Sequence, residues 1–109
     1  EPMTQPQKKT RRQMLEEFAL AHPGDAFARY GLAMECANQN DQPAAVANFE
    51  TLLAEHPAYV SGYFQFGQLL ARMSQIELAR STFTNGIEAA RRAGDHHAAE
   101  EMQAALAQL

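Results

Sequence analysis

The feature of this sequence that most constrains its fold is an internal repeat at a fixed offset. The pair His22–Pro23 recurs as His56–Pro57, which gives an offset of 56 − 22 = 34. At the same offset, apolar or small residues match one another: Leu15 with Phe49, Phe18 with Leu52, Tyr30 with Phe64, Leu32 with Phe66, Ala33 with Gly67, Ala45 with Ala79 and Phe49 with Phe83. A fixed period of this length indicates a stack of similar supersecondary units.

Between the breaking residues, each stretch of the sequence has the spacing of an amphipathic helix. Within residues 42–54, for example, apolar residues recur every three or four positions, so they share one helix face. The β-branched residues Val and Ile, which favour strands, are scarce. The predicted helices span residues 10–21, 26–38, 42–54, 59–73, 75–92 and 96–108, with N-caps at Asp25, Asp41, Ser74 and Asp95. Because the connections are short, consecutive helices are expected to lie antiparallel.

The repeated helix-turn-helix unit, with the residue types at its fixed positions, resembles the tetratricopeptide repeat family. In that family's pattern an aromatic residue and a Leu–Gly pair lie on the first helix, an Ala and a Phe lie on the second, and a Pro closes the unit. The matching residues here are Leu32–Ala33 and Phe66–Gly67, Ala45 and Ala79, Phe49 and Phe83, and Pro57. The sequence departs from the pattern at Arg29, where a Trp is common, and at Arg91, which replaces the second closing Pro. The helix through Arg91 is therefore expected to run past the usual stop.

The resemblance implies an all-α fold, an α-solenoid of antiparallel helix hairpins that forms a superhelix of about six helices. The expected division is a flexible N-terminal tail at residues 1–9 and one repeat domain at residues 10–109, made of a half repeat (10–23), two repeats (24–57 and 58–92) and a capping helix (95–108). A single hairpin cannot bury its apolar side alone, so neighbouring hairpins must stack. Phe49 and Phe83 are expected to fill the space between helix pairs, and Ala33 and Gly67 to let helices approach closely.

No residue pattern in the sequence is typical of catalysis or cofactor binding. His96 and His97 are adjacent, and neighbours on a helix point in different directions, so they do not form the i, i+4 pair of a metal site. Cys36 lies on an apolar helix face and is expected to be a buried small hydrophobe. As the single cysteine it has no intrachain disulfide partner, which fits a reducing compartment such as the cytoplasm. We therefore predict no enzymatic activity, no cofactor and no metal, with a His-based metal protein as the weakest alternative.

The charge balance and hydropathy also bear on partners. The formal net charge is −4, and basic residues cluster only at Lys8–Lys9, Arg11–Arg12 and Arg91–Arg92. Nucleic-acid binding usually needs a broad basic face, so we predict no nucleic-acid partner. The sequence has no run of about 18 apolar residues, so no membrane insertion is expected.

In the family that this sequence resembles, the first helices of successive repeats line a concave groove that holds a peptide or helix of another protein. The resemblance therefore implies a protein-protein interaction module, or adaptor. Carried over by register, the groove residues are Phe27, Tyr30, Met34, Asn38, Phe64, Gln68, Arg72 and Met102. An aromatic and Met-rich surface suits a partner with apolar anchors. Two alternatives stay open: a structural homodimer that uses the groove as its own interface, and side chains that merely pack against each other.

Overall fold

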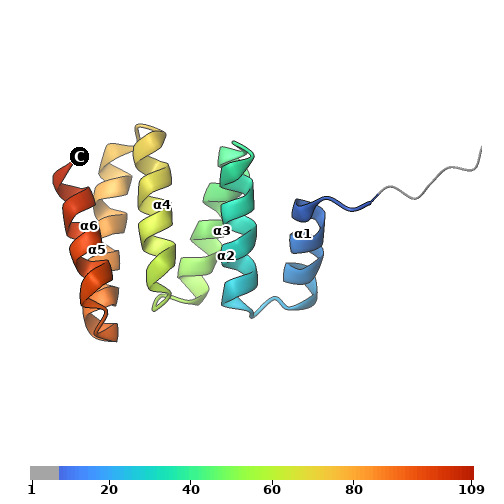
Figure 1. The fold of residues 1–109 in the computed structure, drawn as a ribbon, viewed down its shortest axis with the longest axis horizontal. Helices are drawn as coiled ribbons and strands as arrows, with labels where there is room; N and C mark the ends of the chain where they lie inside the picture. The colour runs from blue at the N-terminus through green and yellow to red at the C-terminus, as the bar shows by residue number, and fades with distance from the viewer. Residues whose placement is uncertain (1–7) are drawn as a thin grey trace, which may run out of the picture.

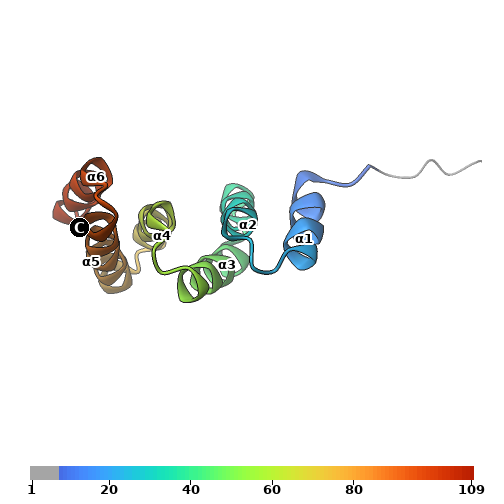
Figure 2. The same cartoon turned by 90° about the horizontal axis from the view of Figure 1, so that it is seen from below.

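The structure of the protein is a computed structural model that describes residues 8–109. The tail predicted at residues 1–9 lies outside the described residues except for its last two. The described chain folds into six helices and contains no strand: α1 (Arg11–Ala21), α2 (Ala26–Asn38), α3 (Gln42–Glu55), α4 (Val60–Arg72), α5 (Ile76–Ala93) and α6 (His96–Ala107). Helices α2, α4 and α6 form one layer, and α3 and α5 form the other, with α1 beside α2 at one end (Figures 1 and 2). The all-α stack of antiparallel hairpins is confirmed.

Three of the described helices, α2, α3 and α6, begin at an Asp that was predicted to cap them. The carboxylates of Asp25, Asp41 and Asp95 accept hydrogen bonds from the backbone N–H three residues ahead, at 3.0, 3.3 and 3.1 Å. Each bond satisfies a donor that the first turn of a helix leaves free. Helix α1 begins with a capping box, in which Thr10 and Gln13 each accept from the other's backbone N–H. The three Asp caps predicted from the sequence are thus confirmed.

Ser74 is a different case, and the prediction that it caps α5 is wrong. Its φ of +61° places it in the left-handed region, where it ends α4, and Gln75 stands at the N-cap without a side-chain bond. Asn40, one repeat earlier, has a φ of +59° and ends α2 in the same way. Both residues follow the C-terminus of a first helix, so the left-handed turn is itself part of the repeat.

The core is a continuous layer of apolar side chains between the two layers of helices. Phe49 and Phe83 are almost fully buried, as predicted. The Phe49 ring stacks on that of Phe66 in the next hairpin, with centroids 5.4 Å apart. Gly67 lies directly against Phe83: a Cβ atom at this position would come 2.7 Å from Cδ1 of the ring. The absence of a side chain at Gly67 therefore lets α4 and α5 approach closely.

Helix α5 breaks the regular spacing of the repeat. It has 18 residues where α3 has 14, and it ends at Gly94, which has a φ of +71°. The extension past Arg91 is therefore confirmed. The N-cap residues of α2, α4 and α6 are Asp25, Tyr59 and Asp95, so the spacing is 59 − 25 = 34 and then 95 − 59 = 36. Helix α6 is consequently displaced by two positions from the regular register.

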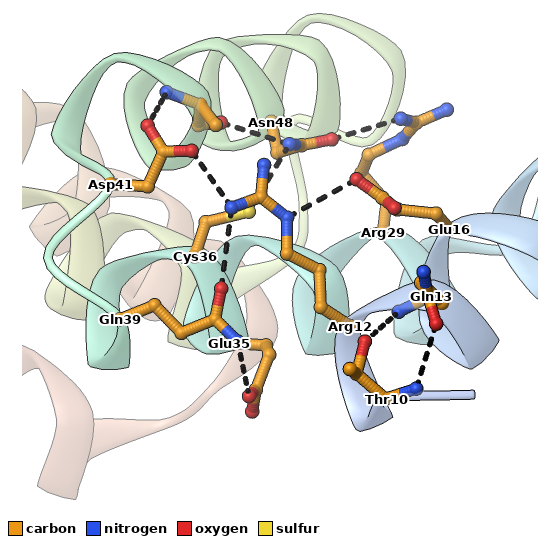
Figure 3. Close-up of polar contacts among 11 residues, drawn as sticks. Thr10, Arg12, Gln13, Glu16, Arg29, Glu35, Cys36, Gln39, Asp41 and Asn48 are labelled. Atoms are coloured by element: carbon orange, nitrogen blue, oxygen red, sulfur yellow. Dashed lines mark hydrogen bonds and ion pairs between the residues drawn. The ribbon is translucent and has the colours of Figure 1, made fainter. Parts of the chain in front are cut away.

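Helix α1 is attached to the stack by apolar packing of Leu15 and Ala19 and by a set of polar contacts. Ala19 is its only buried residue, and among the described helices it contacts α2 alone. The guanidinium of Arg12 donates to Oδ2 of Asp41 at 2.8 Å, to Oε1 of Gln39 at 3.3 Å and to Oε2 of Glu16 at 3.2 Å (Figure 3). These four residues, which we term the Arg12 cluster, join α1 to the turn between α2 and α3.

From the Arg12 cluster we predict that lowering the pH weakens the attachment of α1 to the rest of the stack. The Arg12 guanidinium, aided by the N–H of Ala44, lowers the pKa of Asp41 below its ordinary value. A lowered pKa means that the attachment of α1 is strongest above the ordinary Asp pKa of about 3.9 and weakens as the pH falls through the lower, folded value. Amide hydrogen exchange, corrected for intrinsic rates, should accelerate in α1 below about pH 4 and much less in α5.

The matched variant for this prediction is Asp41→Asn. Asparagine caps a helix about as well as aspartate but carries no charge, so α3 should be unaffected. In this variant α1 should exchange faster already at neutral pH, and the acid-dependent step should shrink. Glu16, Glu17 and Glu35, which pair with Arg12, Lys9 and Arg11, remain in both proteins, so the difference isolates Asp41. An identical pH profile in the two proteins would contradict the assignment.

Candidate functional site

The predicted groove residues of α2 and α4 lie on one surface of the first-helix layer. Phe27, Met34 and Asn38 share one side of α2, since they are spaced by seven and four residues. Phe64, Gln68 and Arg72 follow one another at intervals of four along α4. The two helices contact each other in the same layer (Figure 2). We term the surface formed by these six residues and Tyr30 the α2/α4 face.

Three side chains of the α2/α4 face are exposed to solvent, and the other four are half-buried. Phe27 is 73% exposed, although it is a large aromatic residue on a regular helix. Asn38 and Arg72 are exposed as well, and they occupy the same repeat position, since 72 − 38 = 34. The remaining members, Tyr30, Met34, Phe64 and Gln68, are half-buried.

The half-buried aromatic residues of the α2/α4 face pack against neighbours within the protein. The Tyr30 ring lies 5.3 Å from that of Tyr59, and the Phe64 ring lies 6.4 Å from that of Phe83. Burial raises the pKa of Tyr30, so its phenol stays neutral and retains an O–H that can donate. Tyr30 and Phe64 therefore contribute to packing within the protein, which is one of the alternatives that the sequence left open for these residues. Phe27 does not, because most of its ring is in solvent.

Met102 is the one predicted groove residue whose position the structure corrects. Its side chain is completely buried, and its sulfur lies against Gly86 of α5. The displacement of α6 is the reason. The regular register equates Met102 with Gln68, since 102 − 68 = 34, whereas the observed spacing of 36 equates it with Phe66, a core residue.

The displacement of α6 also identifies residues that the sequence prediction missed. With the spacing of 36, the positions of Phe64, Gln68 and Arg72 in α4 correspond in α6 to Glu100, Ala104 and Gln108, which are all exposed. The signal that could have revealed them is the Gly94–Asp95 pair, which ends one helix and starts the next later than the regular period requires.

The polar end of the α2/α4 face is formed by Asn38 and Arg72. Both stand at the C-terminal ends of their helices, and Arg72 makes no ion pair with any residue in the range 8–109. Its guanidinium and the Asn38 amide therefore remain available as hydrogen-bond donors. The face as a whole offers an apolar anchor at one end and donors at the other, which suits polypeptide binding.

Two hollows in the protein surface lie away from the α2/α4 face. One, of about 380 Å³, is bounded by Pro57, Tyr63 and residues of α5 that include Asn85 and Arg92. The other, of about 330 Å³, lies between α1 and α2 and is bounded by Leu20 and Arg29 among others. Arg29 replaces the family's aromatic residue here, and its guanidinium donates to Oδ1 of Asn48 at 3.0 Å.

The histidines and the cysteine belong to no metal-binding group in the described residues. Within residues 8–109, no three His, Cys, Asp or Glu side chains come together as a metal site requires. His96 and His97 are exposed, and Nε2 of His97 lies 3.5 Å from Oε1 of Glu101. Cys36 is buried, as predicted, and burial raises the pKa of its thiol, which disfavours the nucleophilic thiolate. None of the helices in the described part of the chain is both long and apolar enough to cross a membrane.

Comparison with solved structures finds close matches to this arrangement. The chain is similar to a tetratricopeptide repeat domain protein from Salinibacter ruber solved in solution, with 36% identity, a TM-score of 0.75, and coverage of 79% of this chain and 87% of that one. A crystal structure from the same organism, also described as a tetratricopeptide repeat domain protein, gives 36% identity, a TM-score of 0.73, and coverage of 77% and 94%.

A protein from Bordetella parapertussis shares the fold, with a TM-score of 0.78 at 22% identity, over 93% of this chain and 88% of that one. No protein-family model matches the sequence, and no curated protein does. Kinship with tetratricopeptide repeat domain proteins therefore rests on the two Salinibacter ruber structures, which match 79% and 77% of this chain at 36% identity.

Proposed function

The chain belongs to the tetratricopeptide repeat family, and from this premise we propose that it is a protein-binding module whose α2/α4 face holds a helix or an extended segment of a partner protein. The module contributes shape, apolar anchors and hydrogen-bond donors to an assembly, and it catalyses no reaction. The observation that carries the proposal is the exposure of Phe27 on the layer of first helices.

Three features of the α2/α4 face support the proposal. Phe27 is an aromatic anchor on a rigid helix, and such residues dominate the binding energy of protein interfaces. Tyr30 and Met34 extend the apolar surface along α2. Both side chains are partly buried and pack against the core, which holds them in place. A surface that is already ordered loses little conformational entropy when a partner binds. Asn38 and Arg72 then select partners that place carboxylate or carbonyl oxygens at the polar end.

The test is capture of partners from the native host by the wild-type protein and by Phe27→Asp. The partner that the wild-type protein retains would be purified and its affinity measured for both proteins. Loss of the exposed aromatic anchor should weaken binding by about thirtyfold or more. Leu78→Asp is the matched control, because Leu78 is also largely exposed but lies on α5, in the other layer. Equal affinity of Phe27→Asp and wild type would remove the α2/α4 face from the proposal.

The homodimer alternative makes a separate prediction for the same variant. If the α2/α4 face were the interface between two copies, the wild-type protein would dimerise and Phe27→Asp would be a monomer. Light scattering over a range of concentrations distinguishes the two. We expect a monomer at every concentration, with the α2/α4 face free for another protein.

A further inference from the structure

We propose that the hollow of about 330 Å³ between α1 and α2 binds a carboxylate that is carried on a short aliphatic stem. This hollow, which we term the Arg29 hollow, is bounded by Glu16, Ala19, Leu20, Arg29 and Leu32. Both of its walls are helices of the described chain. It lies on the side of α2 that faces α3, because Arg29 also contacts Asn48 of that helix. The site is therefore separate from the α2/α4 face and does not depend on it.

The guanidinium of Arg29 has donors that no residue in the range 8–109 accepts. Its Nη1 donates to Oδ1 of Asn48 at 3.0 Å, which is the hydrogen bond that Arg29 makes within that range (Figure 3). Its Nε is buried and has no hydrogen-bond partner among the same residues. Buried polar groups in proteins are nearly always paired. An unpaired N–H on a cationic group therefore points to an acceptor from outside the described residues.

The unpaired donors of Arg29 have the geometry that fits a carboxylate. In a guanidinium the Nε–H and one N–H of Nη2 point the same way, and the two oxygens of a carboxylate can accept from this pair. Asn48 occupies Nη1, on the other edge, and the Asn48 amide is itself held because its Nδ2 donates to the carbonyl oxygen of Ala44 at 2.8 Å. Arg29 is thus oriented before a ligand arrives, which reduces the entropy lost on binding.

The equivalent residue of the next repeat shows how this position is satisfied within the chain. Tyr63 holds the position of Arg29, since 63 − 29 = 34. The Tyr63 hydroxyl donates to the carbonyl oxygen of Pro57 at 2.7 Å, so its single polar group is paired. Arg29 instead places a cation with unpaired donors where a Trp is common in the family. This difference between two equivalent positions favours a ligand at the first of them.

The walls of the Arg29 hollow specify the rest of the ligand. Ala19 and Leu32 are buried and Leu20 is 82% exposed, so the stem that carries the carboxylate would contact apolar side chains. An aliphatic stem suits these walls, because binding removes apolar surface from water. Leu20 is the wall residue with the most freedom to move aside, which would let the second oxygen reach the shielded Nε. A glutamate side chain and a free short-chain acid share this chemistry.

Glu16 is the group of the Arg29 hollow that opposes an anion. Its Oε2 accepts from Nε of Arg12 at 3.2 Å, and the same guanidinium pairs with Asp41 at 2.8 Å. Within residues 8–109, Glu16 forms its ion pair with Arg12 and not with Arg29. The Arg29 cation therefore remains available to a ligand. Removing the charge of Glu16 should strengthen the binding of a carboxylate, because like charges repel.

The probe for this site is butyrate, titrated at constant ionic strength into the ¹⁵N-labelled protein with residues 1–109 and followed by NMR. We expect saturable shifts of the Arg29 Nε–H and of the Ala19 and Leu20 amides, in the millimolar range because the ligand is small. Butyramide, which has the same stem without the charge, should give no saturable shift. Arg29→Gln should weaken binding by at least about tenfold. Glu16→Gln should strengthen it by about threefold.

Asn48→Ala is the matched control for Arg29→Gln. It removes the same internal hydrogen bond but keeps the cation, so saturable binding should persist with a smaller loss. If Arg29→Gln lost its folded amide spectrum, Arg29→Tyr would take its place, since the next repeat has a tyrosine at this position. Equal losses in Asn48→Ala and Arg29→Gln would overturn the proposal. So would shifts that rise linearly with butyrate, that butyramide reproduces, or that Arg29→Gln leaves unchanged.

A last measurement identifies the source of the carboxylate once saturable binding of butyrate is established. The affinity of the partner protein captured by the wild-type chain would be measured for Arg29→Gln, and for the wild type with butyrate present. If an acidic side chain of that partner enters the Arg29 hollow, both changes should weaken its binding. If the natural ligand is a free acid, neither change should affect the affinity of the partner. Both results are consistent with a carboxylate site at Arg29, and they separate its two sources.

Discussion

Replacing Phe83 with alanine is expected to lower the free energy of unfolding by about 4 kcal/mol. The ring is almost fully buried between α4 and α5 and lies next to Phe64. Its removal loses apolar burial and leaves a cavity, which the surroundings fill poorly because Gly67 on the facing helix has no side chain to move. Small domains have a total stability of about 5–15 kcal/mol, so the variant would be close to unfolding. Urea unfolding followed by the helical circular dichroism signal measures the change.

Phe27→Ala is the matched control for Phe83→Ala, because it removes the same atoms from an exposed position. Its effect should stay within about 0.5 kcal/mol. The comparison separates burial in the stack from the intrinsic effect of a phenylalanine in a helix. A loss of less than about 1 kcal/mol for Phe83→Ala would mean that the ring does not hold the hairpin together.

The second large effect is expected for Gly67→Val, at about 3 kcal/mol of destabilisation. A Cβ atom at Gly67 would already come 2.7 Å from Cδ1 of the Phe83 ring and closer still to Cε1, and valine adds two methyl groups beyond it. The ring is buried and has no free direction in which to turn. In the first repeat, Ala33 holds the same position beside Phe49, so the stack accommodates one methyl group there but not a branched side chain.

Gly24→Val is the matched control for Gly67→Val. No atom lies within 4 Å of a Cβ placed at Gly24, and its backbone is outside the left-handed region, so the change should be close to neutral. Adding Phe83→Leu to Gly67→Val should recover part of the loss, because the smaller side chain makes room. Equal stabilities of Gly67→Val and Gly24→Val in urea would contradict the close contact between α4 and α5.

The helices and their core could be predicted from the sequence because the repeat supplies several independent signals at each position. Every predicted helix boundary lies within one residue of the observed one. Phe49, Phe83 and Cys36 are buried as expected. Each is fixed by local pattern, as an apolar residue at helical spacing, and the helices of Cys36 and Phe49 also begin at an Asp cap.

The two wrong predictions, at Ser74 and Met102, have different causes. Ser74 has the residue type of an N-cap, but the repeat places a left-handed residue there, as Asn40 shows. Met102 was placed by the regular repeat offset, although α5 is longer than α3 and moves α6 by two positions. The replacement of the closing proline by Arg91 signalled the longer helix. The Gly94–Asp95 pair carries its consequence for α6, because it stands two residues later than the regular period requires.

Contacts between distant residues were beyond reach of the sequence. Nothing in the spacing of Arg12 and Asp41, 29 residues apart, indicates that they pair. Exposure within the α2/α4 face was equally hidden, since Phe27 and Phe64 are both phenylalanines on first helices, yet one is mostly in solvent and the other is half-buried.

The central claim is that the stack of hairpins binds another protein through its α2/α4 face. Hydrogen–deuterium exchange of the purified complex with a captured partner, compared with the free protein, tests it most directly. The account predicts slower exchange in α2, around Phe27 to Asn38, and in α4, around Phe64 to Arg72. Protection confined to α3 and α5, with α2 and α4 exchanging as in the free protein, would contradict it.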